Sequence, residues 1–132
     1  MNQDKRLSIE QVRIKQPSLW YLGDSVAEPI VAVKAYIDEH FKESISLDSL
    51  AALVGLTRFS LAKKFRQNLG ISPYQYVCLV RVSKAQSMIV QGIRPADIAA
   101  AVGFFDQSHL AKHFKRIYGM TPKDYRQQYH QG

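Results

Sequence analysis

Residues 53–76 read LVGLTRFSLAKKFRQNLGISPYQY, and residues 101–125 read AVGFFDQSHLAKHFKRIYGMTPKDY. Each stretch begins with apolar residues that end in a glycine, as at the end of a helix. A basic segment follows, and then a second glycine shortly before Ser-Pro or Thr-Pro. Matching positions lie 48 residues apart before the turn and 49 after it, so the second copy has one extra turn residue. A repeat of this length indicates two copies of one supersecondary unit. Each copy reads as helix, glycine turn and basic helix, the pattern of a helix-turn-helix DNA-binding unit.

Start and stop signals predict seven helices in all. Caps and first-turn prolines mark the starts, and glycines mark most ends. The starts are Pro29, Ser46, Thr57, Ser72-Pro73, Pro95, Asp106 and Thr121-Pro122, and the ends include Gly55, Gly70, Gly92 and Gly103. For the first helix, periodicity predicts one broad buried face. That face would hold Ile30, Val33, Ala35, Ile37 and Phe41.

The helix that starts at Ser72-Pro73 meets no breaker before Gly92. Nineteen residues at 1.5 Å each would form a rod of roughly 28 Å. We therefore expect an all-α, homeodomain-like fold with two helix-turn-helix subdomains, about 29–71 and 92–128, joined by this long central helix over about 73–91. The three segments would form one domain over 28–128. Residues 1–27 are predicted to be a short irregular arm or linker, because their apolar residues follow no helical stripe.

The positive charge of the chain is concentrated in the predicted helices. Four basic and four acidic side chains cancel in residues 1–28, so the net charge of +7 lies in 29–132. No acidic residue falls between Asp48 and Asp97, whereas seven Lys or Arg do. Such a surface favours a polyanionic partner. One cysteine gives no disulfide framework, and no apolar run approaches the ~20 residues of a membrane span, so we expect a cytoplasmic, nucleoid-associated protein.

The two basic helices each have an inward and an outward stripe. In the first, Leu61, Phe65 and Leu69 should pack inward, and in the second Leu110, Phe114 and Ile117 should do so. The outward stripes are Phe59, Ala62, Lys63 and Arg66 in the first copy, and Ser108, Ala111, Lys112 and Lys115 in the second. Small residues beside long cations suit a major groove, where Lys can donate to guanine and Ser to several base edges. Gln107 is a candidate for adenine, and Arg58, Lys64 and Arg116 are candidates for phosphate.

The predicted spacing of the two stripes suits one face of a DNA duplex. Successive major grooves on that face lie about 34 Å apart, close to the rod length plus the width of the packed units. One chain would then occupy two grooves as a monomer. Because the stripes differ (Phe59 against Ser108, Arg66 against Lys115), the site should be asymmetric.

Other functions are less well supported by the residues. Cys78 lies in an apolar run and is expected to be a buried structural thiol. His109 and His113 have a spacing that can bind a metal, but the segment lacks the metalloprotease glutamate, and Lys112 between them would repel a cation. We therefore expect no enzyme activity, no metal site and no cofactor. A non-specific nucleic-acid-binding module, or a protein-interaction module, stays open as the alternative. So does sideways packing of Phe59 on a neighbouring helix.

The chain resembles the AraC/XylS family of bacterial transcription regulators over about 29–128. The most specific motifs are IAAAVGF at 98–104, QSHL at 107–110, FKR at 114–116 and GMTPKDYR at 119–126. The resemblance implies double-stranded DNA as partner, binding near promoters, and activation through RNA polymerase. Family DNA contacts map to Phe59, Ala62, Lys63, Arg66, Gln107, Ser108, His109, Ala111, Lys112 and Lys115. Lys63 and Lys112 replace frequent arginines and lack the bidentate fork, so softer base discrimination is expected.

Most members of that family carry an effector or dimerisation domain before the DNA-binding domain. Only residues 1–28 precede the resemblance in this chain. Two interpretations follow: a stand-alone regulator controlled by its abundance, or the C-terminal part of a longer protein. We expect a monomer on DNA unless such a domain precedes the chain.

Overall fold

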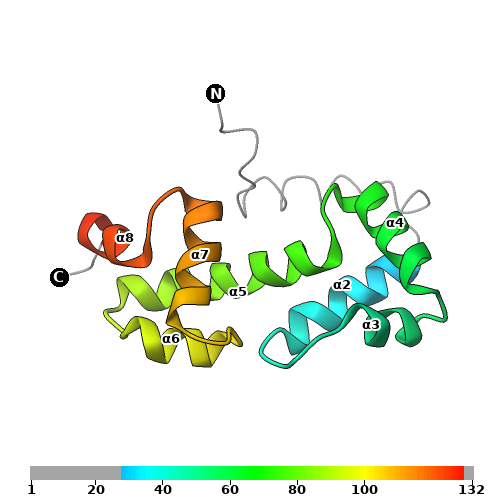
Figure 1. The fold of residues 1–132 in the computed structure, drawn as a ribbon, viewed down its shortest axis with the longest axis horizontal. Helices are drawn as coiled ribbons and strands as arrows, with labels where there is room; N and C mark the ends of the chain where they lie inside the picture. Colours follow the sequence, from blue (N-terminus) through cyan, green and yellow to red (C-terminus); the bar gives the residue numbers. More distant parts are fainter. Residues whose placement is uncertain (1–27, 130–132) are drawn as a thin grey trace. The chain divides into compact units, whose positions relative to one another are not determined.

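Seven α-helices and no strand make up the part of the chain that the structure, a computed structural model, describes, which is residues 28–129. The helices are α2 (Glu28–His40), α3 (Leu47–Leu53), α4 (Arg58–Leu69), α5 (Pro73–Val90), α6 (Pro95–Val102), α7 (Gln107–Tyr118) and α8 (Pro122–Tyr129) (Figure 1). The predicted all-α fold with seven helices is confirmed. The arm predicted over 1–27 lies outside the described residues.

The chain divides into two compact units, and the division falls between Val77 and Cys78, inside α5. We call residues 28–77 the N-terminal unit and residues 78–129 the C-terminal unit. Helix α5 has 18 residues, one fewer than predicted, and so measures roughly 27 Å. Its first turn is closed by a capping box: the Gln75 N–H donates to Ser72 Oγ, and the Ser72 N–H donates to Gln75 Oε1.

In the N-terminal unit, α2 and α3 both pack against α4. Their shared core consists of fully buried side chains, among them Ile30, Val33, Ile37, Leu50, Leu61 and Phe65. The buried face of α2 differs from the predicted one, since Ala35 is exposed and Lys34 is buried. A helix repeats every 3.6 residues, so Lys34 shares the face of Ile30 and Ile37, whereas Ala35 does not. The Lys34 ammonium reaches Asp38 at 3.0 Å.

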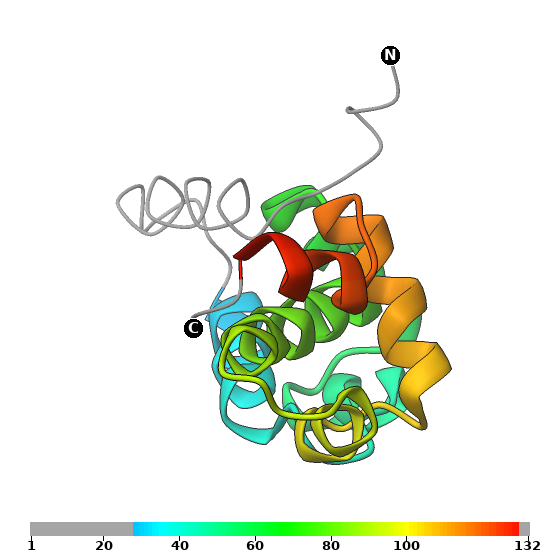
Figure 2. The same ribbon diagram turned by 90° about the vertical axis from the view of Figure 1, so that its left-hand side faces the viewer.

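In the C-terminal unit, α7 contacts both α6 and α8 and runs along one side of the unit from the yellow α6 to the red α8 (Figure 2). The buried core here includes Val82, Ala85, Ile89, Ile98, Leu110 and Phe114. Helix α8 is tied to the end of α5 by Arg126, whose Nε donates to the Ile89 carbonyl at 2.8 Å and whose Nη2 donates to the Ile93 carbonyl. The two bonds join α8 to the last turn of α5 and to the segment that follows it.

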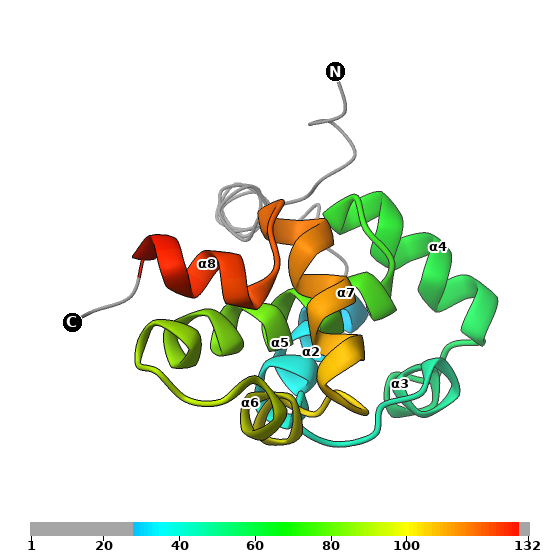
Figure 3. The same cartoon turned by 60° about the vertical axis from the view of Figure 1, so that its left-hand side comes forward.

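The two helix-turn-helix turns share one backbone design. The amide of Leu56 donates to Ala51 O at 3.0 Å, and 48 residues later the amide of Phe104 donates to Ala99 O at 2.9 Å. Each is the long bond of a Schellman motif, which needs a left-handed residue before its donor. Gly55 and Gly103 supply it, with φ of 69° and 96°. Figure 3 shows how sharply the chain turns from α3 into α4.

The extra residue of the second turn is Phe105. Leu56 and Phe104 match through their Schellman bonds, at an offset of 48 residues. The caps that follow, Thr57 and Asp106, match at an offset of 49 residues, since each accepts from the amide three residues on. Phe105, between Phe104 and Asp106, therefore has no counterpart in the first turn, where Thr57 follows Leu56 directly. Its side chain is 90% exposed.

Candidate nucleic-acid interface

Helix α4 presents the predicted stripe on its exposed side. Leu61, Phe65 and Leu69 are buried on the opposite side, as predicted. Lys63 and Arg66 are exposed, and the helix contains no acidic residue. Phe59 is 82% exposed, so its ring does not pack sideways on any neighbour among the described residues. The first predicted stripe therefore combines an exposed aromatic ring with two cations.

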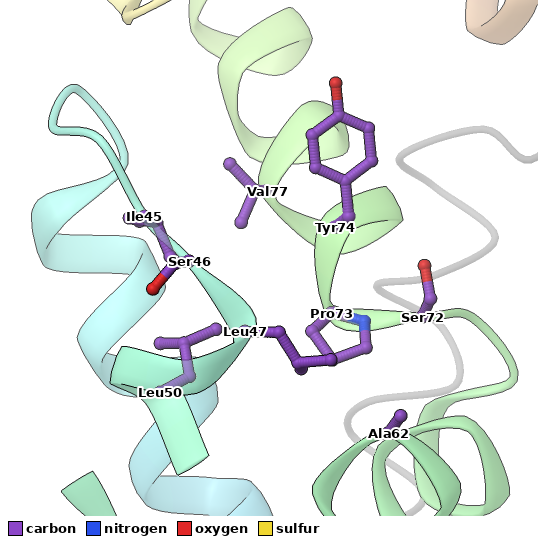
Figure 4. A pocket seen from close by; sticks show the side chains of 9 residues that line it. All are labelled: Ile45, Ser46, Leu47, Leu50, Ala62, Ser72, Pro73, Tyr74 and Val77. Carbon is purple, nitrogen blue, oxygen red and sulfur yellow. The ribbon is translucent and has the colours of Figure 1, made fainter. Parts of the chain in front are cut away.

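Ala62 is the one residue of this stripe that is only half exposed. Its methyl group borders an open apolar pocket of about 160 Å³ between the start of α3, helix α4 and the start of α5 (Figure 4). The pocket is lined by Ile45, Ser46, Leu47, Leu50, Ala62, Ser72, Pro73, Tyr74 and Val77. No local pattern predicts this pocket, because its walls come from three segments that only the fold brings together.

Arg58 opens α4 beside a carboxylate. Its Nε lies 3.4 Å from Asp48 Oδ1, and both side chains are exposed. Exposed ion pairs of this kind contribute at most about 1 kcal/mol and weaken with salt. Arg58 is therefore held only loosely by Asp48, and its guanidinium can exchange that partner for a phosphate.

Helix α7 carries the second stripe in the same manner. Leu110, Phe114 and Ile117 are buried, as predicted, and no acidic residue occurs in the helix. Four of the predicted contact residues are exposed, namely Gln107, Ser108, Lys112 and Lys115, and Ala111 is half-buried. At the start of the helix, the His109 N–H donates to Asp106 Oδ1 at 2.9 Å. This cap leaves Gln107 and Ser108 in the first turn with exposed side chains.

His109 differs from the rest of the second stripe because its ring is turned partly inward. Its Nδ1 is buried and has no hydrogen-bond partner among residues 28–129. The ring meets Phe104 edge-on at 5.7 Å and His113 at 5.0 Å between centroids. Only part of the predicted His109 contact surface is thus available at the outer face of α7.

His113 is buried and belongs to the interior of the C-terminal unit. Its Nε2 lies 3.8 Å from Cys78 Sγ, its Nδ1 lies 2.8 Å from Arg116 Nη2, and its ring stacks on Phe104 at 5.4 Å. Burial, and after it the positive charges of Arg116, His109, Lys112 and Arg81, together lower the pKa of His113 from 6.5 to about 4. The expected buried thiol is confirmed, since Cys78 has no exposed surface.

Residues 28–129 contain no group of three or more His, Cys, Asp or Glu side chains arranged to hold a metal ion. Within the same range, every helix is too short or too polar to cross a membrane.

Comparison with known proteins points to one class of protein. The family described as "Helix-turn-helix domain" matches residues 50–128. The HTH-type transcriptional regulator YbfI of Bacillus subtilis is 38% identical over 89 residues, which are 65% of this chain and 32% of YbfI. The HTH-type transcriptional activator RhaS of Escherichia coli is 26% identical over 115 residues, 86% of this chain and 41% of RhaS. The chain thus spans about a third to two fifths of these relatives.

A solved structure shares the fold and includes DNA. The DNA-binding domain of the global transcriptional factor AdpA, in complex with a target DNA, superposes with a TM-score of 0.70 at 30% identity. The match covers 78% of this chain and 94% of that domain.

Proposed function

Because the chain belongs to the AraC-type helix-turn-helix family of DNA-binding transcriptional regulators, we propose that it reads one asymmetric promoter site with both α4 and α7. In this proposal each helix enters a major groove, and one chain occupies two successive grooves. The bases would be read by Phe59, Ala62, Lys63 and Arg66 on α4 and by Gln107, Ser108, His109, Ala111, Lys112 and Lys115 on α7. Arg58 would contact a phosphate at the edge of the first groove.

One observation carries the proposal above all others. In each unit the recognition helix buries its apolar stripe and exposes a basic stripe that contains no acidic residue. The same glycine turn precedes both helices. A basic face behind a helix-turn-helix turn is how such helices reach base edges, and two of them in one chain favour a bipartite site.

The stripes also differ enough to favour an asymmetric site. Phe59 offers apolar contact with a thymine methyl where Ser108 offers a hydroxyl to base edges. Arg66 can bind a guanine with two bonds, whereas Lys115 acts as a point charge. Two half-sites of different sequence are therefore expected, not a palindrome.

We further propose that the protein activates transcription and contacts RNA polymerase. RhaS, which is 26% identical over most of this chain, is described as an activator. The measurement is in vitro transcription from a promoter that carries the selected site, with and without the protein. Increased transcript supports activation, and decreased transcript indicates repression.

The binding mode is tested by selecting randomised duplex DNA with the purified chain at about 0.15 M salt, a physiological ionic strength. A bipartite, non-palindromic motif with blocks about one helical turn apart is the expected result. A palindrome would point to a dimer that uses one recognition helix per chain. Binding without any enriched motif, falling steeply with salt, would favour the non-specific module instead.

A further inference from the structure

Arg116 continues the row of cations on α7 and touches the buried histidine. It is exposed and follows Lys112 by four residues, so both side chains lie on neighbouring parts of the helix surface. Its Nη2 lies 2.8 Å from His113 Nδ1. A guanidinium has only donors, so Nδ1 must be the acceptor of this bond. The proton of the neutral imidazole is then on Nε2.

The other side of the histidine is held by helix α5. With its proton on Nε2, the ring can donate weakly to Cys78 Sγ, which lies 3.8 Å away. The ring also stacks on Phe104 with an angle of only 6° between the planes. Since His113 is 3% exposed, its ring has little freedom to turn. The Nδ1 lone pair therefore points at Arg116 from a fixed position.

The charge state of the ring supports the same arrangement. Burial and the neighbouring cations lower the pKa of His113 to about 4, so the imidazole is neutral at pH 7. A neutral ring can accept from Arg116, whereas a protonated ring would present an N–H and a positive charge to it.

We infer that His113 is a positioning residue, which holds the Arg116 guanidinium ready for a DNA phosphate at the edge of the second recognition helix. The inference rests on the proposed function and adds His113, which was not among the DNA-binding residues predicted from the sequence. One N–H of Arg116 bonds to His113, and four remain for a phosphate. A guanidinium fixed before binding loses less side-chain entropy when the complex forms.

The N-terminal unit lacks this device. At the offset of 49 residues, Lys64 stands where His113 does and Gln67 where Arg116 does. Both Lys64 and Gln67 are exposed. A lysine side chain has no acceptor, so Lys64 cannot hold a neighbouring donor in the way that His113 does. Lys64 and Gln67 therefore serve as a control pair, at matched positions but without the bond between His113 and Arg116.

The test is a double-mutant cycle on the full chain, with fluorescence anisotropy on a duplex that carries the selected site and on a random-sequence duplex. Arg116→Ala should lower the slope of log K against log salt by about 0.9, the value for one phosphate contact on B-DNA. His113→Leu should weaken binding about 5-fold on both duplexes when Arg116 is present, the scale of ordering one long side chain. In the Arg116→Ala background, His113→Leu should change affinity by less than about 2-fold.

Equal losses from His113→Leu in both backgrounds would overturn the inference and leave His113 a purely structural residue. The cycle of Lys64→Leu with Gln67→Ala should be additive, because those side chains form no such pair.

If His113→Leu does not fold, as judged by circular dichroism and thermal melting, His113→Asn serves in the same cycle. Asn keeps an acceptor near the place of Nδ1, so its affinity should stay close to that of the unchanged chain, and a 5-fold loss would count against the inference.

A second measurement needs no variant. Nitrogen-15 NMR of the imidazole in the unchanged protein should show the proton of His113 on Nε2 at pH 7. A proton on Nδ1 would exclude the bond from Arg116 and overturn the inference. Failure of the proposed function looks different: the unchanged chain would then bind the selected and the random-sequence duplex with equal affinity, or would bind neither.

Discussion

The two helix-turn-helix units are alike in their backbone and differ in the side chains around it. Both turns have the same Schellman bond and left-handed glycine, and both recognition helices end at another left-handed glycine, Gly70 or Gly119. Around these bonds, the first unit has a pocket beside Ala62, and the second has Phe105 and a buried histidine. A few capping and turn bonds therefore set the backbone geometry of both units, while the side chains around those bonds differ.

The largest expected effect tests whether the two cores are equivalent. Phe65 and Phe114 occupy matched positions and are both completely buried. Phe65→Ala and Phe114→Ala should each lower the free energy of unfolding by about 3–5 kcal/mol, from lost burial and the cavity left behind. Guanidinium unfolding followed by circular dichroism gives both values. A loss below about 1 kcal/mol in one variant would show that the two cores are not equivalent.

A pH titration should separate the units, because only the second has a buried histidine. The pKa of His113 is about 4 in the folded chain and 6.5 when the side chain is free, so between these values the unfolded chain binds the extra proton. Stability should therefore fall as pH drops from 6.5 to 4, by up to about 3 kcal/mol. Urea unfolding at several pH values measures this loss, and His113→Leu should remove most of it. An unchanged pH profile in that variant would contradict the account.

Base reading can be compared through two matched lysines. Lys63→Ala and Lys112→Ala should each cost about 1–3 kcal/mol of binding and relax sequence preference in one half-site only. The two affected half-sites should differ. Binding measured against single-base variants of the selected site tests this directly. Uniform weakening on all sequences would assign both lysines to phosphates.

The helix caps should matter less than the cores. Removing the cap oxygen by Thr57→Ala or Asp106→Ala should cost about 1 kcal/mol of stability each. Asp106→Ala should lower stability slightly more than Thr57→Ala, since a carboxylate also interacts with the positive end of the helix dipole. Thermal melting of both variants checks the order, and a larger loss at Thr57 would contradict it.

The smallest effect is expected at the extra turn residue. Phe105 is almost fully exposed, so Phe105→Ser should change the free energy of unfolding by less than about 0.5 kcal/mol. The same unfolding assay provides the measurement. A larger loss would mean that Phe105 packs on a neighbour and that the second turn differs from the first in more than length.

Much of this fold was predictable, because local signals decide it. Ser46, Thr57 and Ser72 were predicted as caps, and each accepts the expected backbone N–H. The buried stripes of α4 and α7 follow from helical periodicity and are confirmed. Asp106 was placed at the start of its helix and proves to be the N-cap just before it.

The remaining features depend on contacts between distant segments. Cys78 and His113 lie 35 residues apart, and nothing in either local sequence indicates that they meet. His109 and His113 lie four residues apart on one helix, yet Phe104 meets the first ring edge-on and stacks on the second. Which DNA bases the stripe residues contact, and at what spacing, stays a prediction.

The most direct test of the central claim is a hydroxyl-radical footprint of the chain on its selected site. If α4 and α7 of one chain bind successive grooves, the footprint should show two protected tracts about one helical turn apart on one face of the duplex. At saturation, one chain should be bound per duplex. A single protected tract, or two chains related by a symmetric site, would contradict the account.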